Sequence, residues 1–224
     1  MKNIFYAFLL VVTLMLSYSC KKKSSDTPTN NTPQNFQPAA AGSTWTYATV
    51  SNNISSSYTL TATSKDTTIN ANNYKVFTNS GGPNEYFTKV SSDYYHYSFY
   101  AAINQSIELL YVKDNLNVNN TWKQTKNATI NGVNGTAELE CVVVEKNMSY
   151  PVGGKTYTDV THIKINPTFY ALGFKLTNNK ADIHYYFANN IGLIYSSTDL
   201  SVAIPLSAPY IYAGTVTLIS SDIK

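Results

Sequence analysis

The chain has 224 residues, with 16 lysines, no arginine and 13 acidic residues. Lys2, Lys21–Lys23 and Asp26 lie near the N-terminus, which leaves 12 lysines and 12 acids in the remainder, a part without net charge. Arginine is the residue most used for bidentate contacts to phosphates and guanines, so this composition argues against a nucleic-acid partner.

The N-terminal segment 1–19 has the pattern of a secretory signal. Lys2 supplies a positive start, and Ile4–Leu16 is apolar apart from Thr13. A helix that spans a membrane would need about 20 such residues. Ser19-Cys20 then resembles the lipobox of a bacterial lipoprotein, where cleavage leaves a lipidated cysteine as the first residue. The alternative is a plain secretory signal with Cys20 as a free thiol.

Residues 20–38 are predicted to be the lipidated cysteine and a flexible tether. The stretch after Cys20 is polar, contains three prolines and has Phe36 as its one apolar side chain. Such a segment buries too little surface to offset the entropy of ordering it. We therefore expect membrane attachment through the acyl chains of Cys20, followed by a single domain over residues 39–224.

The domain contains one cysteine, Cys141, so no disulfide can form within it. The residue stands in the apolar run Leu139–Val144 without a basic neighbour that would activate a thiolate. We expect Cys141 to be a small buried hydrophobic residue.

From residue 43 onward the pattern predicts an all-β domain, an antiparallel meander that forms a curved sheet or half-barrel. Alternating runs rich in Tyr, Val, Thr and Ile favour strands over 44–50, 58–63, 73–77, 138–145 and 157–165. The segment 101–110 comes nearest to a helical pattern, although a strand over 107–112 fits equally well. Turns are predicted at Gly81-Gly82-Pro83, Asn131-Gly132, Asn134-Gly135 and Gly153-Gly154.

Three motifs occur twice and suggest two similar halves. A tryptophan opens a strand in 43–47 and again in 120–123. A turn leads into a tyrosine-bearing strand in 69–77 and 152–160, and aromatic hairpins follow in 85–96 and 184–195. Similar motifs can also recur by chance in any tyrosine-rich β-protein. If the repeat is real, two meanders lie side by side in one continuous sheet.

Four stretches carry a resemblance to a known group of proteins: Gly42–Tyr47, Gly154–Val160, Tyr185–Ile194 and Gly214–Lys224. Together with Cys20 and its lysine run, these motifs resemble uncharacterised outer-membrane lipoproteins of the Bacteroidota, with a G-x-x-W-x-Y opening and a strand pair ending in G-L-I. The resemblance implies a cell-envelope location, on the periplasmic or the exposed face of the outer membrane. Similar strand patterns occur in half-barrel envelope lipoproteins that hold acyl chains, which is an analogy of fold.

Histidines are the natural starting point in a search for catalysis. Asp182 and His184 are two residues apart, which places both side chains on one face of a strand, as two metal ligands or as a carboxylate that orients a histidine. Two ligands alone are weak evidence for a metal site, and an ordinary solvated strand face is the alternative. The sequence contains no nucleophile elbow and no phosphate-binding glycine loop. We expect neither catalysis nor a cofactor.

Strand 93–100 is the most unusual, because alternation gives it aromatic rings on both faces. Tyr94, His96 and Tyr100 share one face, and tyrosine suits stacking on a sugar or contact with a protein. Trp122 is a second candidate platform. The alternatives are a central strand covered on both sides and a tryptophan that anchors the core.

The leading hypothesis is therefore a non-catalytic, lipid-anchored envelope protein that binds a glycan or a protein partner through its aromatic β-surface. A half-barrel carrier or sensor of lipids or other hydrophobic ligands is the alternative, with the rings lining a concavity. A metal-dependent hydrolase built on Asp182 and His184 is the second alternative.

Overall fold

The computed structural model describes residues 34–224, except 101–104, 131, 178 and 205–207. Every regular element in this part is a strand, which confirms the all-β prediction. The predicted signal 1–19, Cys20 and the tether up to residue 33 lie outside the described residues. The strands are β1 (Thr44–Ser51), β2 (Ile54–Ile69), β3 (Asn72–Asn79), β4 (Glu85–Val90), β5 (Asp93–Tyr100), β6 (Gln105–Lys113), β7 (Thr121–Ile130), β8 (Val133–Val152), β9 (Lys155–Ala171), β10 (Phe174–Lys175), β11 (Lys180–Ala188), β12 (Gly192–Val202) and β13 (Tyr210–Asp222).

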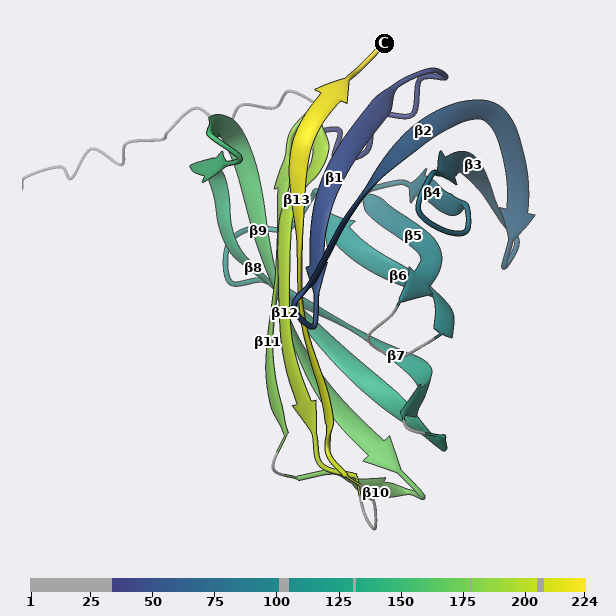
Figure 1. The fold of residues 1–224 in the computed structure, drawn as a ribbon, viewed down its shortest axis with the longest axis vertical. Coiled ribbons are helices and arrows are strands. Elements are labelled where there is room, and N and C mark those ends of the chain that lie inside the picture. The colour runs from purple at the N-terminus through teal and green to yellow at the C-terminus, as the bar shows by residue number, and fades with distance from the viewer. Residues whose placement is uncertain (1–33, 101–104, 131, 178, 205–207) are drawn as a thin grey trace, which may run out of the picture. The chain divides into compact units, whose positions relative to one another are not determined.

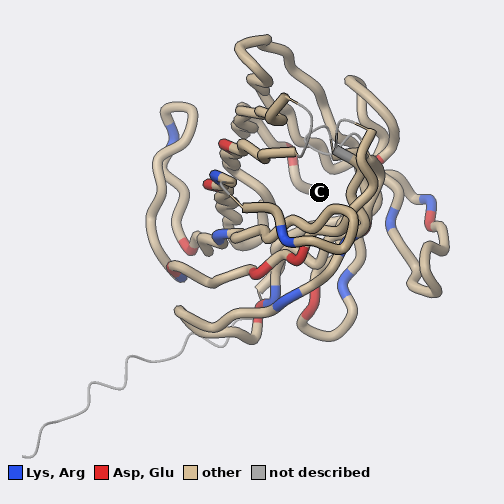
Figure 2. Tube along the Cα trace, turned by 90° about the horizontal axis from the view of Figure 1, so that it is seen from below, with Lys and Arg blue, Asp and Glu red and all other residues tan. Residues whose placement is uncertain are grey.

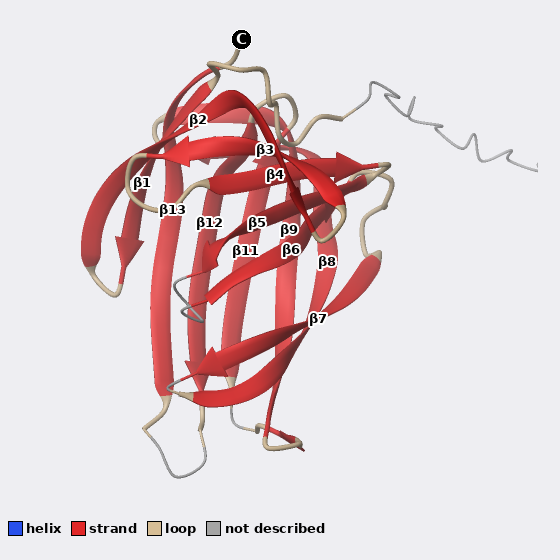
Figure 3. Ribbon diagram, turned by 90° about the vertical axis from the view of Figure 1, so that its right-hand side faces the viewer, coloured by secondary structure: helices blue, strands red, loops and turns tan. Residues whose placement is uncertain are grey.

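The strands form one continuous antiparallel sheet in the order β6-β5-β4-β3-β2-β1-β13-β12-β11-β9-β8-β7, and β10 pairs with the end of β9. In Figure 1, β8, β9, β11, β12, β13 and β1 stand as a tall wall, and β3–β6 lie to one side of it. Figure 3 shows the shorter strands crossing in front of that wall. The predicted curved sheet is confirmed, and it curls until its edge strands β6 and β7 face each other across one open seam.

Two meanders make up this sheet. β1–β6 form the first, and the second runs from β7 to β13, so that pairing of β1 with β13 joins them. The repeated motifs fall on corresponding strands when the short β10, which pairs only with β9, is left out of the count. The tryptophans lie on the first strand of each meander, the turn motifs between the second and third strands, and the aromatic hairpins on the fourth and fifth. The two meanders therefore lie side by side, as the repeat predicts.

Hairpin turns follow the rules for twisted strands. Asn52 and Asn53 connect β1 to β2 with φ of 47° and 68°, and Gly153 and Gly154 connect β8 to β9 with φ of 56° and 78°. Positive φ at both central residues is the type I′ geometry, which matches the twist of the flanking strands. The predicted Gly153-Gly154 turn is confirmed. Asn131 lies outside the described residues.

The turn predicted at Asn134-Gly135 is wrong, because both residues lie inside β8. A Cβ atom on Gly135 would approach the backbone oxygen of Tyr170 to 2.0 Å. The glycine therefore allows β9 to pass close by rather than letting the chain reverse. The helical interpretation of 101–110 is also wrong for its described part, since β6 begins at Gln105 and its alternate residues Leu109 and Tyr111 are buried.

The main core fills the inside of the curled sheet and includes Trp45, Phe77 and Phe187. A smaller apolar cluster, with Phe169 and Leu200 among its members, lies between strands β8, β9 and β12. Cys141 is fully buried, as predicted.

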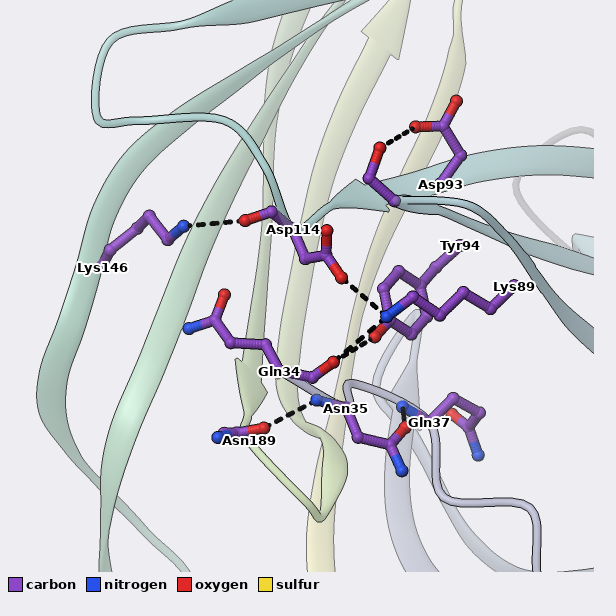
Figure 4. A network of polar contacts seen from close by, with 10 residues as sticks. Gln34, Asn35, Gln37, Lys89, Asp93, Tyr94, Asp114, Lys146 and Asn189 are labelled. Carbon is purple, nitrogen blue, oxygen red and sulfur yellow. Dashed lines mark hydrogen bonds and ion pairs between the residues drawn. The ribbon is translucent and has the colours of Figure 1, made fainter. Parts of the chain in front are cut away.

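The first described residues are part of the folded unit. Phe36 is 0% exposed, with its ring centroid 5.7 Å from that of Tyr94 and 6.4 Å from that of Phe187. Figure 4 shows the polar contacts beside it: the backbone N–H of Asn35 donates to the side chain of Asn189 at 2.7 Å, and the Tyr94 hydroxyl donates to the carbonyl of Gln34 at 2.6 Å. Residues 34–38, assigned above to the tether, thus pack on the sheet.

Charged residues are scattered around the sheet, with lysines and acids interleaved (Figure 2). Several form cross-strand pairs, such as Lys113 with Asp93 at 2.9 Å and Lys164 with Asp182 at 3.1 Å. The described part of the chain has no helix of the length and apolarity that crossing a membrane requires.

Candidate functional site

A cavity of about 430 Å³ lies inside the curled sheet and is lined by strands of both meanders. This volume falls in the range of about 300–1,000 Å³ that is typical of small-molecule sites. The lining is mostly aromatic and hydroxyl-bearing: Tyr47, Tyr58, Tyr100, Tyr111, Tyr185, Tyr212, Phe87, Phe187, Ser98 and Ser196, among others. The arrangement is that of a pocket with an apolar body and a few polar groups.

A chain of hydrogen bonds runs along the cavity wall. The Tyr100 hydroxyl lies 2.9 Å from Nδ1 of His96, and Nε2 of His96 lies 2.8 Å from a carboxylate oxygen of Glu85. The other oxygen of Glu85 accepts a hydrogen bond of 2.8 Å from the side-chain amide of Asn79. Glu85 is 8% exposed, so its carboxylate is held by protein groups rather than by bulk water.

Strand geometry places these side chains together. His96 and Tyr100 are four residues apart on β5 and share a face, as predicted. The neighbouring β4 contributes Glu85 and Phe87, two residues apart and thus also on one face, and the register pairs Phe87 with His96. The two rings stack at 4.2 Å with an interplanar angle of 5°, which fixes the imidazole against the wall.

Tyr111 of β6 carries the most unusual polar group in the cavity. The residue is 6% exposed, and its hydroxyl is buried without a hydrogen-bond partner among the described residues. Burial raises the pKa of Tyr111, and burial likewise raises the pKa of Tyr185 to about 12, so both phenols stay neutral near pH 7. A buried hydroxyl without a partner costs roughly 1–3 kcal/mol of stability.

The aromatic candidates from the sequence separate into two groups. His96 and Tyr100 line the cavity. Tyr94 is 1% exposed in the core, where it supports the segment around Gln34. Trp122 is 7% exposed, and its indole N–H donates to the carbonyl of Leu110 at 3.2 Å. The structure therefore places Trp122 as a core anchor at the seam, the alternative left open above.

The Asp182 and His184 pair does share a face, and His184 Nε2 lies 2.8 Å from Asp182. His184 Nδ1 in turn lies 2.8 Å from Nε2 of His162, whose Nδ1 lies 3.2 Å from Glu145. These side chains form a line rather than a converging set. In the described residues, no three His, Cys, Asp or Glu side chains gather in a way that would hold a metal ion.

The four ring nitrogens of that line make three polar contacts, each of which requires a proton. Two neutral imidazoles carry two N–H groups between them, so the complete line holds one additional proton. Burial is the largest cause that lowers the pKa of His162, and the neighbouring His184 lowers it further.

Several residues of the cavity were not identified in the sequence: Asn79, Glu85, Tyr47, Tyr58, Tyr111, Tyr185 and Tyr212. Glu85 had a usable signal, because it alternates with Phe87 and so belongs on the same, inward face as that ring. The tyrosines had none, since their convergence depends on strands from both halves of the chain.

The fold and the cavity together define the structural class of this protein. It is a single antiparallel sheet that curls until it is nearly closed and surrounds a space of ligand size. A chain described as a "putative lipoprotein" from Parabacteroides distasonis has a similar crystal structure, with a TM-score of 0.53 and 11% sequence identity over 84% of this chain and 99% of that one. At this identity the similarity shows a shared fold. No family model and no curated protein sequence matches the chain.

Proposed function

We propose that this protein is a lipid-anchored envelope lipoprotein that binds a small ligand, without catalysis, in the cavity between its two meanders. The observation that carries the proposal is the cavity of about 430 Å³, which is lined by aromatic and hydroxyl-bearing side chains of both meanders. A cavity of this kind is the usual form of a small-molecule site.

The anchor rests on separate support. Cys20 follows an apolar signal and precedes a lysine run, and the fold is shared with a chain described as a "putative lipoprotein". The membrane contact would then be the acyl chains on Cys20. Intact mass of the protein expressed in a bacterial host tests this point: the wild type should carry acyl mass at Cys20, and Cys20→Ala should not.

The cavity favours the carrier or sensor version of the hypothesis over binding on an open aromatic surface, because His96 and Tyr100 face inward. The open-surface version keeps one observation in its favour. Tyr86 and Tyr97, which are half-buried and do not line the cavity, pack edge to face at 5.9 Å. These rings would suit a glycan or a protein partner.

Native mass spectrometry of gently extracted protein tests ligand binding directly. Ser98 is buried in the cavity wall, so Ser98→Trp should fill the space and abolish any co-purified small molecule. Ser57→Trp is the matched control, because Ser57 is exposed and does not line the cavity. If no bound molecule is found, or if it survives in Ser98→Trp, the cavity is not the binding site.

A further inference from the structure

The charged side chain that lines the cavity is acidic. Among the described residues that line it, Glu85 is the only Lys, Asp or Glu, and His96 is the only histidine. No lysine of the described part lines the space, and the chain has no arginine. An anionic group bound inside the cavity would therefore find no cationic side chain among the described lining residues, which is unfavourable.

Neighbouring side chains hold the Glu85 carboxylate in the cavity wall through hydrogen bonds. Tyr100 has a hydroxyl proton to donate to Nδ1 of His96, and Nε2–H of the imidazole then donates to Glu85. Asn79 supplies the remaining donor. All of these contacts are satisfied with a neutral imidazole, unlike those of the His162–His184 pair. Each carboxylate oxygen also keeps a free lone pair for a further donor.

The aromatic rings near the Glu85 carboxylate also favour a cation. Tyr47 and Tyr58 lie with their ring centroids 5.3 Å apart, and Phe87 and Tyr111 belong to the same lining. The faces of aromatic rings attract cations, and several rings around one site form the cages that recognise alkylated ammonium groups. The phenols remain neutral, because burial is the main cause that raises the pKa values of Tyr47 and Tyr111.

From this arrangement we infer that the ligand is a cationic amine with an apolar or aromatic body, its ammonium group held by Glu85 and the surrounding tyrosine rings. The inference rests on the proposed function and specifies its ligand class.

Three probes of similar size separate charge from shape: benzyltrimethylammonium, its neutral isostere neopentylbenzene, and benzoate. Binding to the full mature chain is measured by calorimetry or by tyrosine fluorescence. The expected result is at least about tenfold tighter binding of the cation than of the neutral isostere, with benzoate weakest. Because this comparison uses the wild type alone, it does not depend on the folding of any variant.

Glu85→Gln keeps the shape of the side chain and removes its charge. We expect it to weaken binding of the cation by about tenfold or more and to leave the neutral isostere unchanged. Glu138→Gln is the matched control, because Glu138 lies outside the cavity lining and pairs with Lys123. Thermal melting confirms that both variants are folded.

Equal or tighter binding of neopentylbenzene or benzoate would overturn the inference and leave cavity binding intact. Failure of all three probes would also overturn it. The proposed function is judged separately, by the co-purified molecule and its loss in Ser98→Trp, so the two failures are distinguishable.

Discussion

The side-chain amide of Gln124 on β7 forms two hydrogen bonds with the backbone of Leu110 on β6, as a residue of a neighbouring strand would. Its amide oxygen accepts from the Leu110 N–H at 3.1 Å, and its amide nitrogen donates to the Leu110 carbonyl at 2.8 Å. The two residues lie on the facing edges of the seam, where regular strand pairing stops (Figure 3). Gln124 thus holds the two edges of the sheet together at this point, with Trp122 as a second donor to the Leu110 carbonyl.

Replacement of Gln124 by Met should open this contact, because Met has a similar length and forms no amide hydrogen bonds. We expect a loss of about 1–3 kcal/mol in the free energy of unfolding, since two backbone groups of Leu110 lose the amide partner. Urea unfolding measures the loss, and hydrogen exchange should show faster exchange at the Leu110 amide. The control is Gln105→Met on β6, where no side-chain hydrogen bond forms among the described residues. Equal stability of the two variants would contradict the role of Gln124.

Phe36 should be essential to the folded unit although it belongs to the polar N-terminal stretch. Because the ring is fully buried against Tyr94 and Phe187, Phe36→Ala should lower the free energy of unfolding by about 3–5 kcal/mol. Phe174→Ala is the control, since Phe174 is 75% exposed and its loss should cost under about 1 kcal/mol. Similar losses in both variants, measured by urea unfolding, would show that the segment 34–38 does not stabilise the fold.

Because of His162, the free energy of unfolding should fall in mild acid. Its pKa is lowered in the folded protein, mainly by burial, so the unfolded chain binds a proton that the folded chain resists. Neutral His162 contributes fully to the free energy of unfolding above the pKa of an unfolded histidine, about 6.5. This contribution is lost as the pH falls from that value through the lower pKa of His162 in the folded protein. Urea unfolding of the wild type between pH 7.5 and 5 should therefore show a steeper decline than that of His162→Gln. NMR titration of the imidazole should give a midpoint below that of an unfolded histidine. Parallel stability curves would contradict the prediction.

Cys141 should be unreactive in the folded protein. Burial raises the pKa of its thiol to about 12, so at pH 8 only about one molecule in ten thousand carries the reactive thiolate. In a Cys20→Ala background, iodoacetamide should modify Cys141 only after the addition of urea. Ser57→Cys in the same background places a thiol at an exposed position and should react without urea. Rapid native labelling of Cys141 would show that the strand around it opens.

Local periodicity determined much of this structure in advance. Alternation along β5 correctly placed His96 and Tyr100 on one face, and the two-residue spacing of Asp182 and His184 did the same on β11. These relationships hold within a single strand, where side chains alternate whatever the rest of the chain does. The all-β class, the correspondence of the two meanders and the burial of Cys141 follow from the same local patterns.

Only the tertiary structure decided which face of β5 is internal, because rings on both faces make the alternation ambiguous. It also decided the partners: Glu85 meets His96 through the register of β4 with β5, and His162 meets His184 through the register of β9 with β11. The cavity needs still more, since Tyr58 and Tyr185 come from different meanders and converge when the sheet curls. Register and curvature are set by the summed packing of many distant residues, and no short stretch of sequence contains that sum.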